Sequence, residues 1–252
     1  RGLLMARSED MELCGSDMSS LEDRTKQHYM WKHDPENVKD MMRPDFDPHC
    51  DMAIAANLMT LGDAEFYKSF DKEAEHPSDV KARFKNLALV RHAGKGTNYA
   101  ATYGATGPTI ARSAGVSDEI GEVLYNAYWE RNWSVRAFAE DQNIRKINGE
   151  MWVQNPVSKF WHSLRYEKDV FSTLNQSTGA YCFDRWVANY RLKRPNIIGQ
   201  FHDESINLVR KGEEDEHTSV LKWAIEKLNK DLKLNVDLGI DVQYGQKYSD
   251  VH

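Results

Sequence analysis

The stretch Arg91–Gly104, RHAGKGTNYAATYG, decides how the rest of the sequence is interpreted. At helical spacing its basic and aromatic residues recur every fourth position, which places Arg91, Lys95, Tyr99 and Tyr103 in one stripe. Two cations four residues apart repel each other by roughly a few tenths of a kcal/mol, and a bound anion would neutralise both. The tyrosines would offer a flat surface for stacking a ring. The stretch predicts a nucleoside triphosphate site; the alternative is a solvated basic turn followed by core tyrosines.

Acidic residues follow a predicted strand near the start of the chain. Met11–Ser16 (MELCGS) is short and apolar, which predicts a buried strand that ends at Asp17. Ser19 or Ser20 would then cap a helix that runs through Tyr29. A carboxylate between a strand end and a helix start is well placed to hold a cation, although a lone aspartate there is more often a turn or capping residue.

A second acidic segment lies near the C-terminus. Asn196–Phe201 and Ser205–Val209 have the pattern of two strands that meet around the sequence His202-Asp203-Glu204. Because side chains alternate faces along a strand, we expect His202 and Glu204 to share one face and Asp203 to take the other.

Three motifs, in this order along the chain, resemble those of family A (Pol I-type) DNA polymerases. The first palm motif is matched by DMSSLEDR (Asp17–Arg24), the fingers-helix motif by Arg91–Gly104, and the last, hydrophobic-His-Asp-Glu motif by FHDES (Phe201–Ser205). Each piece alone is weak, and the combination in the right order is a strong signal. The chain's last residues are similar to the end of phage members of the family at Gly245, Tyr248 and His252.

The resemblance implies an α+β fold, in which a small antiparallel palm sheet backed by helices carries an inserted helical fingers subdomain. The palm would comprise residues 1–40 and 148–252, and the fingers residues 41–147. The family's thumb and 3′–5′ exonuclease would lie outside this chain. The chain would then be a fragment, or one half of a split polymerase whose other half is a second polypeptide.

Local patterns predict the remaining elements. We expect helices from Pro35 through Met41, at Cys50–Leu61, in a long segment from Ser78 to about Tyr103, and at Thr109–Ala114, Asp118–Trp129, Ser134–Ile147, Glu167–Arg191 and, as an exposed helix, Glu213–Asn229. We expect further strands at Met151–Val153 and Val236–Val242. Gly94 and Gly96 would weaken the long helix by about 1 kcal/mol each relative to alanine and let a phosphate approach its backbone.

The resemblance also implies nucleotidyl transfer with two metal ions. Mg²⁺, with Mn²⁺ as a substitute, would be held by Asp17, Asp203 and the backbone carbonyl of Met18, since hard cations take oxygen ligands and two of them serve the attacking and leaving oxygens. Glu204 would support the site, and His202 would orient the primer end.

Nucleotide binding falls to six residues by the same resemblance: Arg91, Lys95, Tyr99, His49, Glu22 and Tyr103. Arg91 and His49 would bind the β- and γ-phosphates, for which the forked guanidinium is suited. Lys95 would neutralise the leaving pyrophosphate and donate a proton to it. Tyr99 would stack on the incoming nucleotide, and Glu22 would reject ribonucleotides on the 2′ side of the sugar.

Contacts with primer-template DNA are implied for three residues: Gln176, His202 and Arg24. Gln176 would read the minor groove; the asparagine that the family carries four residues earlier is Ser172 here, while Asn175 directly precedes the glutamine. Lys159–Trp161 is a further candidate for touching DNA, and Tyr103 would lie at the templating base. Because fewer backbone phosphates are contacted without a thumb, we expect a second polypeptide or a processivity factor as partner.

Composition sets outer bounds. The chain has 252 residues, is 40% hydrophobic and 29% charged, and contains no run of about 18 apolar residues and no signal peptide. We therefore expect a soluble protein without a membrane partner. Its odd number of distant cysteines (Cys14, Cys50 and Cys182) suits reduced thiols in a cytoplasm, that of the host if the source is a phage.

The net charge of −6 counts against nucleic-acid binding in general, but Lys81–Lys95 concentrates positive charge locally. Three other functions compete with a DNA polymerase. A single-subunit RNA polymerase shares a similar helix, but Glu22 and the His-Asp-Glu form of the last motif argue against it. An inactive palm-fingers scaffold of a replisome has no chemical need for the full set of acidic and basic site residues. A helical DNA-binding module lacks any helix-turn-helix or zinc-ligand spacing.

Overall fold

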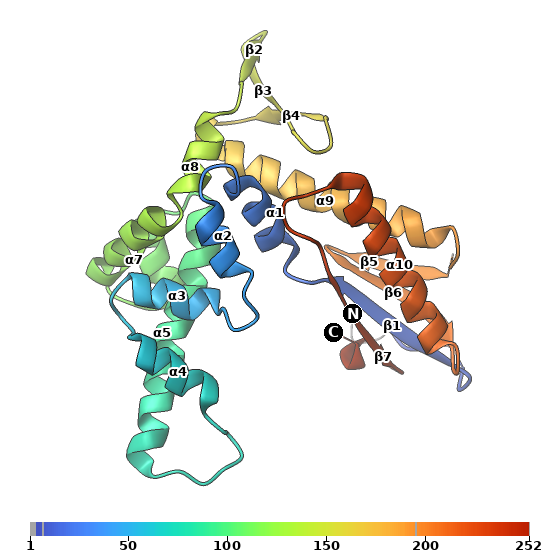
Figure 1. Cartoon of the computed structure of the whole chain (residues 1–252), viewed down its shortest axis with the longest axis horizontal. Helices are drawn as coiled ribbons and strands as arrows, with labels where there is room; N and C mark the ends of the chain where they lie inside the picture. Colours follow the sequence, from blue (N-terminus) through green and yellow to red (C-terminus); the bar gives the residue numbers. More distant parts are fainter. Residues whose placement is uncertain (1–3, 7, 195, 252) are drawn as a thin grey trace. The chain divides into compact units, whose positions relative to one another are not determined.

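The computed structural model describes residues 4–6, 8–194 and 196–251 (Figure 1), so His252 lies outside the described residues. The chain divides into two compact units. The sheet unit comprises residues 1–31, 143–164 and 173–252, and the helical unit residues 32–142 and 165–172. The boundaries at 31/32 and 142/143 lie nine and five residues before the predicted ones at 40/41 and 147/148. That the units act as palm and fingers stays a prediction.

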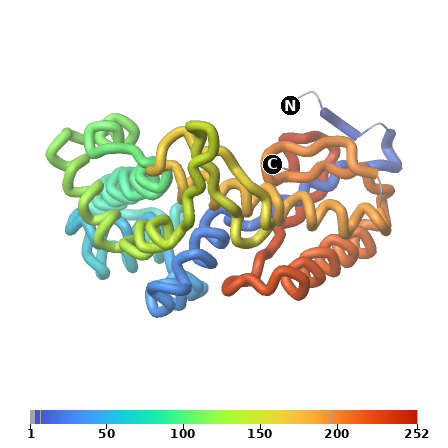
Figure 2. Tube along the Cα trace, turned by 90° about the horizontal axis from the view of Figure 1, so that it is seen from above, coloured from blue at the N-terminus to red at the C-terminus, as the bar shows by residue number. Residues whose placement is uncertain are grey.

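The sheet unit is built on four antiparallel strands in the order β5-β6-β1-β7. Their bounds are β1 Met11–Met18, β5 Ile197–Phe201, β6 Glu204–Arg210 and β7 Ile240–Gly245. The helices of this unit are α1 (Leu21–Met30), α9 (Val170–Arg191) and α10 (Glu214–Leu232), with a 3₁₀ turn η2 at Tyr248–Asp250. Figure 2 shows α9 and α10 on the same face of the sheet.

Alternation along β1 separates two different faces of the sheet. Cys14 and Met18 are buried against α9 and α10, in a core that includes the fully buried Trp186 and Leu221. The opposite face carries Leu13, Gly15 and Asp17 at every second position of β1. A small apolar cluster covers the first part of that face, formed by Leu13, Ile206, Tyr248 and Val251. The apolar cluster does not include Asp17, which lies farther along the same face of β1.

A second, three-stranded sheet in the order β2-β3-β4 also belongs to the sheet unit. Its strands are β2 Arg145–Ile147, β3 Glu150–Gln154 and β4 Trp161–Leu164. Asn148 and Gly149, with φ of 50° and 83°, form the two-residue turn between β2 and β3, as expected where both central residues need positive φ. The prediction of a helix through Ile147 was therefore wrong.

The helical unit surrounds the long helix α5 (Ser78–Thr102). The other helices are α2 Pro35–Met41, α3 Pro48–Ala55, α4 Leu61–Ser69, α6 Gly107–Ala114, α7 Asp118–Arg131, α8 Trp133–Glu140 and the 3₁₀ turn η1 Glu167–Asp169. Small residues on α5, such as Ala93 and Ala101, pack with Met52, Ile110 and Tyr128 in the core. None of the helices in the described part of the chain combines the length and apolarity needed to cross a membrane.

Several element boundaries differ from the predictions for local reasons. The helix expected at Cys50–Leu61 instead begins at Pro48, where Asp47 accepts hydrogen bonds from the first turn, and it ends at Ala55. Asn57, with φ of 56°, adopts a left-handed conformation that helices do not continue through. Ser20 is also left-handed and makes no side-chain cap to α1, so the predicted serine cap is wrong.

Two predictions near the C-terminus also need correction. The helix expected to be exposed, now α10, buries Leu221, Ala224, Ile225 and Leu228 along one face. The strand expected at Val236–Val242 begins only at Ile240. The burial of α10 follows from its amphipathic spacing, because apolar residues that recur every three to four positions form a face that packs on a core. The three cysteines are buried and unpaired, as expected.

Candidate active site

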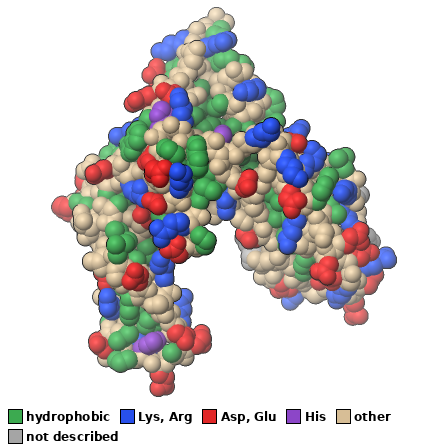
Figure 3. All heavy atoms as spheres, viewed as in Figure 1, with side chains coloured by type: hydrophobic (Ala, Val, Ile, Leu, Met, Phe, Trp, Pro, Cys, Tyr) green, Lys and Arg blue, Asp and Glu red, His purple; other side chains and the backbone are tan. Residues whose placement is uncertain are grey.

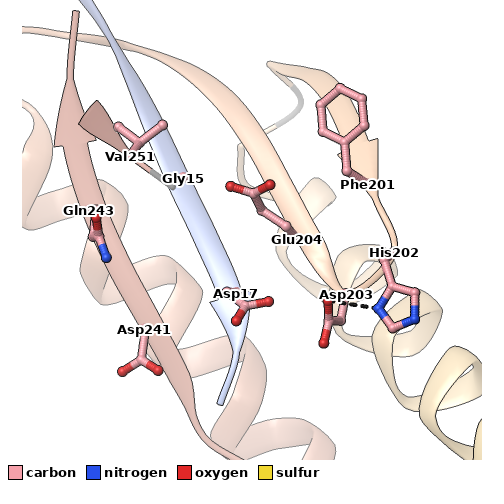
Figure 4. Close-up of a pocket in the computed structure, with 9 residues that line it drawn as sticks. All are labelled: Gly15, Asp17, Phe201, His202, Asp203, Glu204, Asp241, Gln243 and Val251. Atoms are coloured by element: carbon pink, nitrogen blue, oxygen red, sulfur yellow. Dashed lines mark hydrogen bonds and ion pairs between the residues drawn. The ribbon is translucent and has the colours of Figure 1, made fainter. Parts of the chain in front are cut away.

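Three carboxylates lie in one row across the sheet. Asp17 on β1 is registered opposite Glu204 on β6 and opposite Asp241 on β7. The three therefore project from the same face, next to Gly15 and beyond the apolar cluster (Figure 4). They line a cavity of about 500 Å³ together with His202 and other residues of the same unit. Like charges placed directly opposite one another destabilise a sheet, so this row needs a functional explanation.

The predicted His202-Asp203-Glu204 segment is a turn followed by a strand. Phe201 pairs with Glu204, so His202 and Asp203 form the two-residue connection between β5 and β6. His202 adopts a left-handed φ of 60°, and the backbone N–H of Met18 donates to the carbonyl of Asp203 at 3.2 Å. The prediction that His202 and Glu204 share a strand face opposite Asp203 was wrong, because strand alternation does not continue through a turn.

The acidic row changes the protonation of its central member. Burial, followed by the carboxylates of Asp203, Glu204 and Asp241 in that order, raises the pKa of Asp17 to about 6. The Asp203 carboxyl also lies within hydrogen-bond reach of Asp17. Crowded, half-buried carboxylates with a raised pKa are typical of sites that bind a cation or move a proton.

His202 is exposed and held by acidic neighbours. Its Nδ1 lies 2.9 Å from Asp203 Oδ1, and its Nε2 lies 4.0 Å from Glu22 Oε1. The hydrogen bond with Asp203 is the largest influence and raises the pKa of His202; burial opposes this, while the charges of Asp203, Glu22 and Asp17 add to it. The ring is thereby fixed at the rim of the cavity, with Asp203 as its anchor (Figure 4).

The far end of the chain positions Glu204. Its side chain is almost fully buried, and the Tyr248 hydroxyl donates to Glu204 Oε2 at 2.7 Å. A Cβ at Gly15 would lie 2.3 Å from the Val251 carbonyl oxygen, so only glycine lets the C-terminal segment pack this closely on β1. Tyr248, one of the C-terminal residues that resemble the end of phage members of the family, thus holds a site residue directly.

Asp241 is the site residue that sequence reasoning missed. Its carboxylate accepts a hydrogen bond from Ser19 Oγ at 2.7 Å, which also explains why Ser19 does not cap α1. The only available signal was an acidic residue inside an alternating strand, between Ile240 and Val242. That signal is common on solvated strand faces, and only the register with Asp17 shows its place.

The donor set suits hard cations in part. The carboxyl groups of Asp17 and Asp203 are side by side and have the oxygen chemistry that Mg²⁺ prefers. Among the residues that the structure describes, however, no group of three or more His, Cys, Asp or Glu side chains is arranged to hold a metal. The set implied by the resemblance contains only two side chains and the Met18 carbonyl, and therefore does not require such a group.

The predicted DNA contacts on α1 and α9 have different surroundings. Gln176 is exposed, whereas Asn175 is buried: it accepts from Thr25 Oγ1 at 2.8 Å and donates to the Glu22 carbonyl at 3.1 Å. Asn175 therefore joins α9 to α1 and does not replace the asparagine that the family carries at the Ser172 position. Arg24 donates through Nη1 to the Asp237 carbonyl at 2.8 Å, so part of its guanidinium is committed within the protein.

The predicted nucleotide-binding stripe lies within the helical unit, on α5. Arg91 is paired with Asp47, with Nε 2.8 Å from Oδ2, so a carboxylate already neutralises this cation. Burial opposes ionisation of Asp47, but the hydrogen bond from Arg91 and those from the backbone of Cys50 and His49 leave its pKa below the usual value. Arg91 is therefore balanced without a bound anion, and anion binding by the stripe stays a prediction.

The aromatic part of the stripe is exposed as expected. Tyr99 is 50% and Tyr103 39% exposed, and the His49 ring lies 6.3 Å from that of Tyr99. Asn98 donates to the Pro48 carbonyl at 2.8 Å, which ties α5 to the start of α3 beside His49. The four predicted members His49, Arg91, Lys95 and Tyr99 thus gather where α3 and α5 meet.

The glycines around Lys95 serve packing. A Cβ at Gly94 would lie 2.3 Å from the His49 carbonyl oxygen, and Gly96 faces Ala114 on α6. The missing side chain of Gly94 faces α3, so the prediction that the glycines open the backbone to a phosphate was wrong for Gly94. Its absence allows α3 to approach α5 closely, whereas a Cβ at Gly96 would make only ordinary contact with α6.

Positive charge is less concentrated than the sequence suggested. Of the basic residues between Lys81 and Lys95, Arg83 pairs with Asp63 at 2.7 Å and Arg91 with Asp47. On the face shown in Figure 3, basic and acidic side chains are interspersed. Electrostatic attraction for a polyanion must therefore come from individual cations such as the exposed Lys95.

Among solved structures, a similar fold occurs in a structure that is described as the POL domain of Pol1 from M. smegmatis in complex with DNA primer-template and dNTP. The TM-score is 0.72 at 19% sequence identity, and the match covers 100% of this chain and 42% of that one. The predicted α+β fold, a small antiparallel sheet backed by helices, is thereby confirmed. No protein-family model matches the sequence, and no characterised protein matches it.

Proposed function

We propose that this chain is the palm and fingers of a family A-type DNA polymerase, which adds deoxynucleotides to a primer 3′-OH under the direction of a template. One observation carries the proposal: Asp17, Asp203 and Glu204 meet at one end of the sheet in a polymerase-like fold, and Asp17 has a raised pKa there. A structural role alone would not favour acids at adjacent positions.

In this mechanism Asp17 and Asp203, with the carbonyl of Met18, would hold two Mg²⁺ ions, which when bound supply charge neutralisation and favour ionisation of the primer hydroxyl. The side-by-side carboxyl groups support this assignment. Glu204, whose carboxylate is held by the Tyr248 hydroxyl, would add a fixed negative charge beside the two metal-binding aspartates. His202, anchored by Asp203 at the rim, would orient the primer end.

The helical unit would bind the triphosphate. Lys95 is exposed and has the charge to stabilise the leaving pyrophosphate and to deliver a proton to it. Arg91 would contact the phosphates once they displace or share its partner Asp47. Tyr99 would stack on the nucleotide, beside His49. Glu22 would restrict the 2′ side of the sugar, which makes deoxynucleotides the expected substrates.

Primer-template DNA and dNTPs are the proposed partners, because the structural neighbour is described as bound to both. The match spans 42% of that neighbour, so we further propose that a thumb or processivity factor, supplied by additional polypeptide, completes the grip on DNA. Gln176 would contribute a minor-groove contact from the exposed side of α9.

The test is primer extension with Mg²⁺ and the four dNTPs, by the chain alone and with the polypeptide encoded beside it. Asp203→Asn removes one charge without changing shape and should reduce extension by at least about a hundredfold, as expected when electrostatic stabilisation is lost. Asp184→Asn, the same change at an exposed position on α9, should leave extension unchanged.

The outcomes separate the proposal from its alternatives. Undiminished extension by Asp203→Asn would refute the assigned site. Extension with ribonucleotides as efficient as with deoxynucleotides would indicate an RNA polymerase and remove the role of Glu22. No extension under any condition, with DNA binding retained, would indicate a scaffold.

A further inference from the structure

The three-stranded sheet β2-β3-β4, which we call the arm (residues 143–164), has one buried and one open face. Register places Arg145 and Ser163 opposite Trp152, and Trp161 opposite Gln154. These residues therefore share a face, while Val153 and Leu164 on the other face are buried. Figure 1 shows the arm as separate from the four-stranded sheet.

The open face of the arm is aromatic and apolar, and it carries Arg145 and Glu150. Trp161 is 38% and Ile147 52% exposed there. Phe160, in the loop before β4, is 62% exposed and contacts Tyr181 on α9. The Arg145 guanidinium lies over the Trp161 ring, 4.5 Å from its centroid. An arginine stacked on a tryptophan keeps both groups flat and presented to solvent. Large exposed apolar side chains that are clustered mark binding surfaces.

The arm is held firmly to α9. Asn155, directly after β3, donates through Nδ2 to Ser177 Oγ and to Thr178 Oγ1, both at 2.8 Å. Phe160 adds an edge-to-face contact with Tyr181. Ser177 directly follows Gln176, the proposed minor-groove contact. The open face is thus preorganised, which lowers the entropic cost of binding.

The arm as a whole carries more basic than acidic residues: Arg145, Lys146 and Lys159 against the single acid Glu150, in a chain whose net charge is −6. By register, Arg145 and Glu150 project from the open face and Lys146 from the other. Single-stranded nucleic acid is bound by this combination in general: cations follow the backbone and aromatic rings stack with bases. A sheet face is a common platform for such stacking.

We propose that the open face of the arm binds unpaired DNA, namely the single-stranded part of the template, with Trp161 and Arg145 as the principal contacts. The identity of this strand rests on the proposed polymerase function, since a template-directed enzyme always carries unpaired template. Bases stack on Trp161 and its neighbours, and the guanidinium of Arg145 contacts phosphate or extends the stacking surface.

The experiment measures, by fluorescence anisotropy, the binding of a labelled primer-template with a long 5′ template overhang and of the same duplex with blunt ends. Wild type should bind the overhang substrate more tightly. Trp161→Ala should lower that overhang-dependent affinity by about tenfold, the typical size of one base-aromatic stack, and leave blunt-duplex affinity unchanged. Trp161→Phe, which keeps a stacking ring, should restore most of it.

A charge control uses a second cation that lies over a tryptophan. Lys193 Nζ lies 3.6 Å from the Trp223 ring centroid, outside the arm. Arg145→Ala should weaken overhang binding and reduce the dependence of log affinity on log salt by somewhat under one, whereas Lys193→Ala should do neither. Thermal unfolding of each variant excludes loss of fold as the cause.

Equal affinity of wild type and Trp161→Ala for the overhang substrate would overturn the inference. It would also be overturned if Trp161→Ala abolished self-association or the binding of a protein partner but left DNA binding unchanged. Failure of the polymerase proposal is seen separately. If the wild-type protein binds overhangs through Trp161 but never extends a primer, the polymerase proposal is refuted and the DNA-binding surface stands. If it extends primers but shows no overhang-dependent affinity, the DNA-binding surface is refuted and the polymerase proposal stands.

Discussion

Asp17→Asn should stabilise the protein while it abolishes synthesis. Burial and then the charges of Asp203, Glu204 and Asp241 raise the pKa of Asp17 from 3.8 to about 6. A shift of about two units corresponds to roughly 3 kcal/mol for the ionised form. Because Asp17 is only half-buried, solvent screens part of this, and we expect a cost of about 1–2 kcal/mol.

The sign follows from proton binding. Between about pH 4 and pH 6 the folded chain keeps a proton on Asp17 that the unfolded chain has lost, so stability falls as pH rises through this window. Above pH 6 the full cost is present. Asparagine has the same shape and no charge, so Asp17→Asn should be about 1–2 kcal/mol more stable than wild type at pH 7.5, and this gain should disappear as pH falls toward 4.

The assay is urea unfolding followed by tryptophan fluorescence, in EDTA, at pH 5 and pH 7.5. Asp184→Asn, an exposed acid on α9, is the control and should change stability by less than about 0.5 kcal/mol. Adding Mg²⁺ should stabilise wild type and leave Asp17→Asn unaffected, because a ligand stabilises only the state that binds it. A less stable Asp17→Asn at pH 7.5, or a gain that does not depend on pH, would refute this account of the acidic row.

Three further predictions concern groups that support the two sites. Tyr248→Phe removes the hydroxyl that donates to the buried Glu204 and should lower the unfolding free energy by about 1.5–3 kcal/mol; unchanged urea unfolding would contradict it. Asp47→Asn keeps the cap of α3 but releases its arginine partner, so KM for dNTP should fall about fivefold; a raised KM would show that Asp47 chiefly orients the guanidinium. Gly94→Ala places a methyl group 2.3 Å from a backbone oxygen and should destabilise by about 1–3 kcal/mol, whereas Gly96→Ala, with nothing closer than 3.7 Å, should be neutral or stabilising in thermal unfolding.

Local signals predicted most elements because they act within a few residues. The apolar run before Asp17 forms β1, and the Asp34-Pro35 pair begins α2 with the Asp34 side chain accepting from Asn37 N–H. Such features depend on periodicity and capping, which neighbouring residues determine. The long helix α5 was predicted for the same reason, and its tyrosines are exposed as expected.

Errors arose where a short turn competes with a longer pattern. Asn148-Gly149 is among the strongest hairpin signals in a sequence, yet the apolar spacing of Ser134–Ile147 favoured a helix that reached Ile147, directly before it. The structure ends α8 at Glu140 and begins β2 at Arg145. Turn residues with positive φ have a fixed backbone requirement, and they therefore outweigh periodicity, which is only a statistical tendency of side chains.

The composition of the site depended on information that no local pattern contains. Asp241 is an ordinary acid in an alternating strand until β7 is paired with β1, when it becomes the neighbour of Asp17. Asp47 is a helix cap by sequence, and only the packing of α3 against α5 shows that it also neutralises Arg91. Cross-strand register and helix packing are set by cores that involve distant residues. The same distant packing assembles the acids at a cost in stability, which is the trade-off expected where a site must attract cations.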